Sequence, residues 1–203
     1  MKKKPKTRNW GLTFVLLVFV LLSSCSPRTQ DKTHNSPDSA MLTAFAEAGI
    51  PLLRETVSAR DFSLPLLSPE ITGDARENHV YKSLHAQKGN VVLLYFWATW
   101  CGPCRAGMIA LESLYNLYKD RGLEILAVNI SENEAQVQTF ALNNQITFPI
   151  LLDSDGRVSR TYGVRAIPTI FLVDREGRIM LRKVGSPDWN SPEIHAALDY
   201  LFP

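Results

Sequence analysis

The segment VVLLYFW, residues 91–97, constrains the fold more than any other part of the chain, because seven consecutive residues are apolar or aromatic. This pattern is typical of a strand whose two faces are both buried, as in the middle of a sheet that has helices on both sides. Cys101 and Cys104 follow soon after it, separated by Gly102 and Pro103. The sequence therefore predicts a central strand that leads into a Cys-x-x-Cys loop.

Helical and strand patterns alternate along the rest of the chain. Apolar residues recur at helical spacing after the cysteines until Gly122, and Ser131 with Glu134 fits a capping box that begins another helix, expected to run to about Asn144. Further expected elements are a helix over 41–47, strands over 61–64, 123–130 and 149–152, a helix over 158–162, a hairpin of strands 168–173 and 178–184, and a helix over 192–201. This order indicates an α/β fold with a mixed central sheet.

The first 24 residues differ in kind from the remainder. Five Lys or Arg residues between positions 2 and 8 precede an uncharged, mostly apolar run over 10–22 and then small residues. This arrangement predicts a secretory signal peptide over residues 1–24. The alternative is an uncleaved membrane anchor, but the apolar run is shorter than the roughly 20 residues that a helix needs to cross a bilayer.

The residues Leu22-Ser23-Ser24-Cys25 resemble the lipobox of bacterial lipoproteins, in which the cysteine carries the lipid. We therefore expect a lipid on Cys25 and a place in the bacterial cell envelope, facing the periplasm or extracytoplasmic space; a free or disulfide-bonded Cys25 is the alternative. Residues 25–55 are expected to form a tether and a short N-terminal segment, followed by one domain over 56–203. Without residues 1–24 the chain has 17 basic and 20 acidic side chains, a formal charge of −3, so no basic surface suggests nucleic acid.

The cysteine count limits the chemistry. Of the three cysteines, lipidation of Cys25 would leave only Cys101 and Cys104 in an oxidising compartment, which excludes a scaffold of several disulfides. A structural zinc site needs about four ligands, and the four histidines stand outside any ligand spacing, so no metal site is predicted. A Cu(I) carrier is a better alternative because thiolates suit Cu(I), although only Met108 lies close in sequence.

The position of Cys101 predicts a reactive thiol. At the start of a helix, unpaired backbone N–H groups and the helix dipole favour a negative charge, and in a Cys-x-x-Cys setting a thiol pKa of about 8.5 can fall to between about 3.5 and 7.5. Cys101 is therefore the expected nucleophile. Cys104, one turn into the helix, is expected to be more buried and to resolve the mixed disulfide that Cys101 forms.

Several motifs together resemble the TlpA/ResA branch of the thioredoxin superfamily. They are the entry Asp61-Phe62-x-Leu64, the stretch FWATWCGPCR at 96–105, and Ala166-Ile167-Pro168-Thr169 with the turn at 174–177. The resemblance covers about residues 56–203 and implies a thioredoxin-like fold with an extra strand and helix within 131–152. It also implies a cis Ile167–Pro168 bond packed against the disulfide, and Trp100 is expected to shield the thiolate while Trp97 belongs to the core.

The resemblance implies a protein disulfide oxidoreductase that needs no cofactor. Its substrates would be protein thiols and disulfides, such as the cysteines of apocytochrome c or of copper-site proteins, with an upstream electron donor. A thiol peroxidase is a further alternative, but the Pro-x-x-x-Thr-x-x-Cys pattern of peroxiredoxins is absent, because Leu94 and Ala98 stand at its proline and threonine positions.

Two departures from the family concern the resolving cysteine. Tyr95 stands where thioredoxins proper carry a buried aspartate, and Gly107 stands where many relatives carry a glutamate. Those carboxylates help to move the proton of the resolving thiol. Deprotonation of Cys104 is therefore expected to depend on water, on Tyr95 or on groups from elsewhere in the chain, or to be slower.

Overall fold

The computed structural model describes residues 38–68 and 80–202. The predicted signal peptide and the predicted lipidation of Cys25 lie outside the described residues. Among the residues that are described, none belongs to a helix with the length and apolar character required to cross a membrane.

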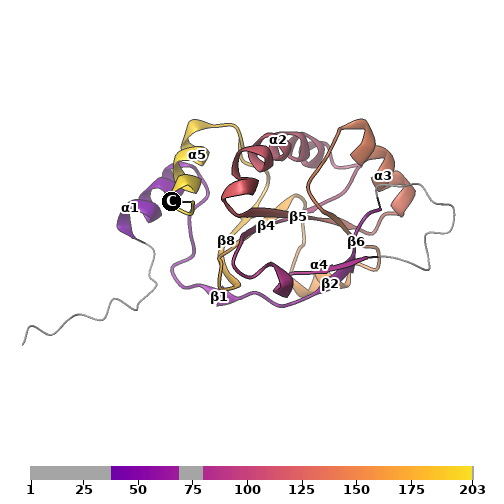
Figure 1. Cartoon of the computed structure of the whole chain (residues 1–203), viewed down its shortest axis with the longest axis horizontal. Coiled ribbons are helices and arrows are strands. Elements are labelled where there is room, and N and C mark those ends of the chain that lie inside the picture. The colour runs from indigo at the N-terminus through magenta and orange to yellow at the C-terminus, as the bar shows by residue number, and fades with distance from the viewer. Residues whose placement is uncertain (1–37, 69–79, 203) are drawn as a thin grey trace, which may run out of the picture. The chain divides into compact units, whose positions relative to one another are not determined.

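A six-stranded mixed sheet forms the centre of the described part (Figure 1), with strand order β1-β8-β7-β4-β5-β6. Strands β4, β5 and β6 run parallel, whereas β7 and β8 are antiparallel to their neighbours. The strands are β1 (Val57–Ser58), β4 (Val91–Trp97), β5 (Leu123–Ile130), β6 (Ile150–Asp153), β7 (Thr169–Val173) and β8 (Arg178–Val184). The predicted α/β class with a mixed central sheet is confirmed.

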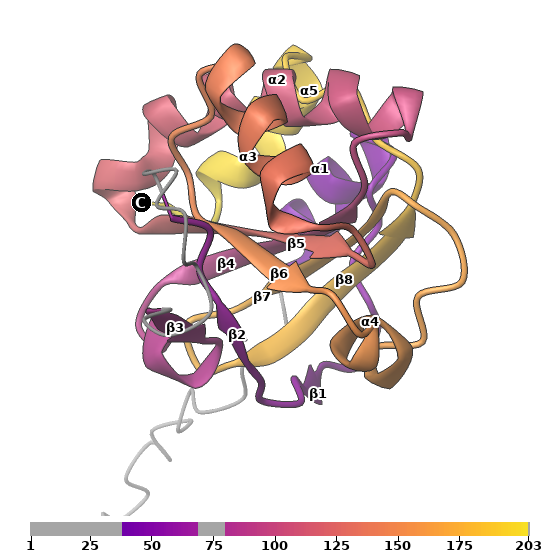
Figure 2. The ribbon, with the colours of Figure 1, turned by 90° about the vertical axis from the view of Figure 1, so that its right-hand side faces the viewer.

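Helices cover both faces of the sheet, but unequally (Figure 2). One face carries α1 (Ser39–Glu47), α2 (Gly102–Tyr118), α3 (Glu134–Asn143) and α5 (Pro192–Asp199). The other face carries α4 (Arg157–Thr161) and the antiparallel pair of β2 (Ser63–Pro65) and β3 (Tyr81–Ser83). Two short 3₁₀ helices, η1 (His85–Gln87) and η2 (Lys119–Arg121), complete the elements of the described residues.

Strand β4 divides its side chains between the two faces. Val91, Leu93, Tyr95 and Trp97 belong to the core beneath α1, α2, α3 and α5. The alternate residues Val92, Leu94 and Phe96 belong to the core beneath α4 and β2. Every residue of β4 is at most 2% exposed, and burying a large apolar side chain stabilises the fold by about 1.5–3 kcal/mol, so this strand anchors both layers. It also fixes the direction in which the following loop leaves the sheet.

The segment before β3 reaches both edges of the sheet. β1 pairs with the outer side of β8, and Leu53 N–H donates to the Met180 carbonyl oxygen at 2.7 Å. Further along, Leu66 forms an antiparallel bridge with Leu151 of β6. Between these two contacts, Phe62 and Leu64 are buried under the face that carries α4. A single stretch of chain thus crosses one face of the sheet and pairs with the strand at each edge.

Most of the predicted elements are confirmed, and the bounds of β4 and β5 agree with the prediction. The predicted capping box at Ser131 is wrong. Asn133 is the N-cap of α3, and its side chain accepts a hydrogen bond from Gln136 N–H at 3.0 Å, while Ser131 lies in the left-handed region with φ 57°. Asn is as good an N-cap as Ser, so the helix begins two residues later than a capping box at Ser131 requires.

Candidate active site

The two cysteines of the Cys-x-x-Cys loop form a disulfide at the start of α2. Cys101 is the N-cap residue, with extended backbone angles, and its sulfur accepts a hydrogen bond from Cys104 N–H at 3.2 Å. Pro103 stands in the first helical turn, where its missing N–H leaves no bond unmade. The predicted position of Cys101 at the helix start is confirmed, and the helix dipole together with the N–H of Cys104, which donates to the sulfur, favours a thiolate.

The two sulfurs differ in their access to solvent. Cys101 is 7% exposed and Cys104 is 0% exposed, as predicted, while Gly102 and Pro103 lie on the surface. A disulfide or thiol on another molecule can therefore reach Cys101 but not Cys104. This asymmetry suits Cys101 for the first attack and Cys104 for the second.

A cis peptide bond lies beside Cys101, as the resemblance implied. The Ile167–Pro168 bond is cis, Pro168 is buried, and Ile167 is half-buried. The Ile167 carbonyl oxygen lies 3.8 Å from Cys101 Sγ. A disulfide sulfur has no proton to donate, so this is a packing contact in the oxidised protein, and a weak S–H donation becomes available when Cys101 is reduced.

The two tryptophans near the loop have different surroundings. Trp100, directly before Cys101, is 73% exposed. Trp97 is fully buried, and its ring centroid lies 4.9 Å from that of Phe140 on α3, which confirms its place in the core. The expected shielding of the Cys101 thiolate by Trp100 remains a prediction. The exposed indole is also placed where it could contact an incoming substrate.

Glu132 holds the Cys-x-x-Cys loop, and no pattern in the sequence indicates this role. Its carboxylate accepts hydrogen bonds from Thr99 N–H at 2.7 Å, from Thr99 Oγ1 at 2.5 Å and from Asn129 Nδ2 at 2.7 Å. Hydrogen bonds to a charged group are worth about 1.5–3 kcal/mol each. Glu132 therefore fixes the backbone two residues before Cys101 and places a negative charge on the Cys101 side of the site.

Tyr95 lies beneath the other cysteine. Its side chain is fully buried, and its hydroxyl donates to the Cys104 carbonyl oxygen at 3.2 Å. Burial raises the pKa of Tyr95 to about 12, while a hydrogen bond with Ser186 opposes that rise. The phenol is therefore uncharged at neutral pH. Ser186 comes from the loop between β8 and α5, and sequence reasoning missed it as well.

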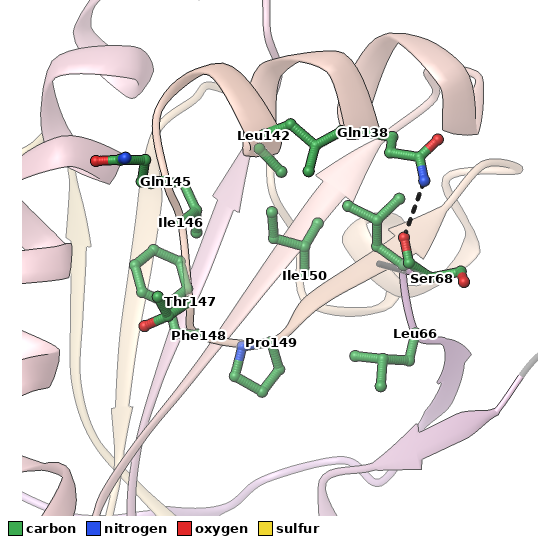
Figure 3. A pocket seen from close by; sticks show the side chains of 12 residues that line it. Leu66, Ser68, Gln138, Leu142, Gln145, Ile146, Thr147, Phe148, Pro149 and Ile150 are labelled. Atoms are coloured by element: carbon green, nitrogen blue, oxygen red, sulfur yellow. Dashed lines mark hydrogen bonds between the residues drawn. The ribbon is translucent and has the colours of Figure 1, made fainter. Parts of the chain in front are cut away.

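A separate apolar pocket of about 530 Å³ lies between α3 and the start of β6. Figure 3 shows Leu142, Ile146, Phe148 and Ile150 around it, with Gln138 Nε2 donating to the Ser68 carbonyl oxygen at 3.1 Å. The lining residue Thr147 donates its N–H to Glu112 of α2, eight residues beyond Cys104, so the pocket lies further along α2 than the cysteines. It is not part of the cysteine site.

Within residues 38–68 and 80–202, no three His, Cys, Asp or Glu side chains gather in a way that could hold a metal ion. Of the four histidines, His85 and His195 fall in this part of the chain. The His195 ring nitrogen Nε2 lies 3.2 Å from the Trp189 carbonyl oxygen, and the His85 main-chain N–H donates to Asp61 Oδ1 at 2.8 Å. Both contacts belong to local packing.

A Cys-x-x-Cys disulfide at a helix N-terminus, with a cis-proline beside it and a mixed sheet beneath, defines a thioredoxin-like protein. A model of the AhpC/TSA family matches residues 57–182, and the chain belongs to that family. The resemblance to the TlpA/ResA branch of the thioredoxin superfamily is confirmed by the relatives described next.

Two curated relatives come from bacilli and related bacteria. The chain is 38% identical over 116 residues to the thiol-disulfide oxidoreductase ResA of Geobacillus thermodenitrificans, a match that covers 57% of this chain and 66% of the relative. It is 41% identical over 150 residues to the thioredoxin-like protein YneN of Bacillus subtilis, which covers 72% and 81% respectively. The chain spans about half to two thirds of the length of the ResA relatives that it matches.

A solved structure supports the same fold. A putative thiol:disulfide interchange protein DsbE from Chlorobium tepidum superposes with a TM-score of 0.62 at 30% sequence identity. The superposition covers 74% of this chain and 99% of the DsbE chain. The predicted thioredoxin-like fold is thereby confirmed.

Proposed function

We propose that this chain is an extracytoplasmic, membrane-anchored thiol–disulfide oxidoreductase that reduces protein disulfides through a Cys101/Cys104 cycle. The observation that carries the proposal is the pairing of an accessible sulfur at a helix N-cap with a fully buried partner, joined in one disulfide. The names of ResA and of the DsbE-like structure, which describe thiol–disulfide chemistry, support it.

The cycle follows from the different access of the two sulfurs. In the reduced protein the Cys101 thiol releases its proton, the resulting thiolate attacks one sulfur of a substrate disulfide, and the other substrate sulfur leaves and takes up that proton. The Cys104 thiol then loses its proton and its sulfur attacks Cys101 Sγ, which releases the second substrate sulfur and forms the Cys101–Cys104 disulfide. The pair loses two electrons and two protons, and the substrate disulfide gains them.

The surroundings of Cys101 have roles in this cycle. The Ile167 backbone lies against Cys101 beside the cis-proline, and an extended substrate segment would pair with the main chain here. Trp100 and the exposed Gly102 and Pro103 would contact that segment at the surface. The substrates are disulfides between protein cysteines, and the family suggests those of apocytochrome c or of copper-site proteins. An upstream electron donor then reduces the Cys101–Cys104 disulfide again.

The location is part of the same proposal. The lysine-rich start, the apolar run and the Leu22-Ser23-Ser24-Cys25 sequence support export, cleavage and lipidation at Cys25. Metabolic labelling with a fatty acid should label the wild-type chain, and Cys25→Ala should abolish the label. A label that survives in Cys25→Ala would contradict lipidation at this residue.

The activity is tested by trapping. In Cys104→Ser, Cys101 should accumulate mixed disulfides with substrate proteins, which can be identified after purification under non-reducing conditions, and Cys101→Ser is the matched control that traps nothing. The redox state of the wild-type pair should change when the supply of reductant to the envelope changes. If Cys101 traps no protein and the pair binds Cu(I) stoichiometrically without turning over a disulfide, the oxidoreductase proposal is wrong.

A further inference from the structure

The Tyr95 hydroxyl holds the backbone of the resolving cysteine. Tyr95 is on the face of β4 that packs against α2, and its hydroxyl donates to the Cys104 carbonyl oxygen at 3.2 Å. Cys104 stands in the first turn of α2, so this bond ties the start of the helix to the sheet. A buried hydrogen bond at this point restricts the position of Cys104 relative to β4 and hence to Cys101.

The helix leaves room for this hydroxyl at Gly107. A Cβ atom on residue 107 would overlap the Tyr95 hydroxyl oxygen and would lie 2.7 Å from Ser186 Oγ. Residues 104 and 107 are three apart on a helix and so share a face. The hydroxyls of Tyr95 and Ser186 therefore occupy the space that a side chain at position 107 would fill.

Ser186 links this cluster to the surface. It is hydrogen-bonded to Tyr95, and unlike Tyr95 it is half-buried rather than fully enclosed. Its single hydroxyl proton can be donated either to the Tyr95 oxygen or to the Pro187 carbonyl oxygen, which lies 3.3 Å from Ser186 Oγ. Tyr95 and Ser186 thus connect β4, the first turns of α2 and the loop after β8 through uncharged groups.

We propose that Tyr95, supported by Ser186 and given room by Gly107, is a positioning residue that aligns Cys104 for its attack on the mixed disulfide at Cys101. The proposal rests on the proposed cycle and concerns only its second step. In that step the Cys104 sulfur bonds to Cys101 Sγ, the Cys101–substrate bond breaks, and the departing substrate sulfur takes up the proton that Cys104 has lost. The Tyr95 hydroxyl is hydrogen-bonded to the Cys104 backbone, so Tyr95 acts through Cys104.

The test separates the two steps of the cycle. The substrate is a peptide that contains a disulfide. Rapid acid quench and mass spectrometry measure the rate at which the mixed disulfide forms and the rate at which it is resolved. Tyr95→Phe should slow resolution by about fivefold, the effect of one hydrogen bond, and leave the first attack by Cys101 unchanged. Ser186→Ala should slow resolution by about twofold.

Tyr118→Phe is the matched control, because Tyr118 is also buried on this face and its hydroxyl donates to the His195 carbonyl oxygen at 3.3 Å, near the far end of α2. It should leave both steps unchanged. Equal slowing in Tyr118→Phe and Tyr95→Phe, or unchanged resolution in Tyr95→Phe, would overturn the positioning role. A wild-type protein that forms no mixed disulfide would instead contradict the proposed function.

A rescue experiment identifies the hydroxyl as the cause. Serine in a helix donates to carbonyl groups three or four residues earlier, so a serine at position 107 can reach the Cys104 carbonyl oxygen. In the Tyr95→Phe background, Gly107→Ser should resolve the mixed disulfide at least threefold faster than Gly107→Ala, which adds similar bulk without a hydroxyl. Equal rates in the serine and alanine variants would show that the hydroxyl does not position Cys104.

Discussion

The two sulfurs of one disulfide have opposite surroundings. Around Cys101 the chain places a helix N-terminus, the Glu132 carboxylate on Thr99 and an exposed Trp100. Around Cys104 it places a buried phenol, a serine and a glycine. The first side is charged and reaches solvent, and the second is uncharged and closed. Reactivity is therefore adjusted at Cys101, while geometry is fixed at Cys104.

The largest effect should come from filling the closed side. Gly107→Ala forces a Cβ atom against the Tyr95 hydroxyl. Overpacking of this kind should lower the free energy of unfolding by about 3 kcal/mol. Urea denaturation of the variant and the wild type measures this difference. Tyr95→Phe should remove more than half of that cost. The control is Gly102→Ala, whose Cβ atom would have no neighbour within 4 Å, with an expected change below about 0.5 kcal/mol. An equal cost of Gly107→Ala in both backgrounds would contradict the steric argument.

On the charged side, Glu132→Gln should lower stability by about 2 kcal/mol, because a carboxylate that accepts from both donors of Thr99 is lost. It should also speed alkylation of reduced Cys101 below pH 8, since removal of a nearby negative charge lowers a thiol pKa. Glu112 is a matched control, because it accepts from Thr147 N–H at 2.9 Å and from Thr147 Oγ1 at 2.5 Å in the same manner. Glu112→Gln should lose stability without altering Cys101, and a similar change in alkylation by both variants would refute the local charge effect.

The closed side should also respond to alkaline pH. Burial raises the pKa of Tyr95 from 10.0 to about 12, so the folded state retains a proton that the unfolded state loses. The stabilisation is complete below pH 10 and is lost as the pH rises through 12. At pH 11 this amounts to about 1.4 kcal/mol of lost unfolding free energy relative to pH 9.

Urea unfolding of the oxidised protein at pH 9 and pH 11 measures this loss. Tyr95→Phe should lose about 1.4 kcal/mol less than the wild type over that interval, because it has no phenol to ionise. The difference between the two proteins cancels the contributions of the other tyrosines. Parallel losses in the two proteins would mean that Tyr95 ionises as easily in the folded state as in the unfolded chain.

The smallest effect on stability is expected at Trp100. Because its side chain is 73% exposed, Trp100→Ala should change the unfolding free energy by less than about 0.5 kcal/mol. The same variant should raise the KM for a protein disulfide several-fold and leave the reduction of a small disulfide reagent unchanged. Tyr200→Ala, at an aromatic residue that is 49% exposed, controls for the loss of surface aromatic area. A KM unaffected by Trp100→Ala would place the substrate on another surface.

The sequence predicted the parts of the fold and site that depend on local pattern. β4 and β5 are continuous apolar runs, and the place of Cys101 follows from the junction between such a run and a helix. Glu132 was missed because its partner Thr99 lies 33 residues earlier, and no local pattern links them. The cap of α3 was misplaced because Ser131 and Asn133 are both suitable caps, and the choice depends on the conformation of the turn.

Tyr95 and Gly107 were recognised as departures from the family, but their relation was not. They stand on a strand and on a helix, so only the packing of α2 on β4 shows that the hydroxyl of one occupies the space of a side chain at the other. Ser186 joins them from a loop about 80 residues later, at a distance in sequence that no periodicity reports. Compensating substitutions of this kind become visible only with the three-dimensional contacts.

The segment that pairs with both edge strands has a consequence for self-association. Open strand edges offer unpaired N–H and C=O groups to other molecules and promote aggregation. Here β1 shields β8 and Leu66 shields β6, and both belong to one continuous stretch of chain. Detachment of the whole stretch would free both edges at once, and a sheet with two open edges can add molecules in two directions and polymerise.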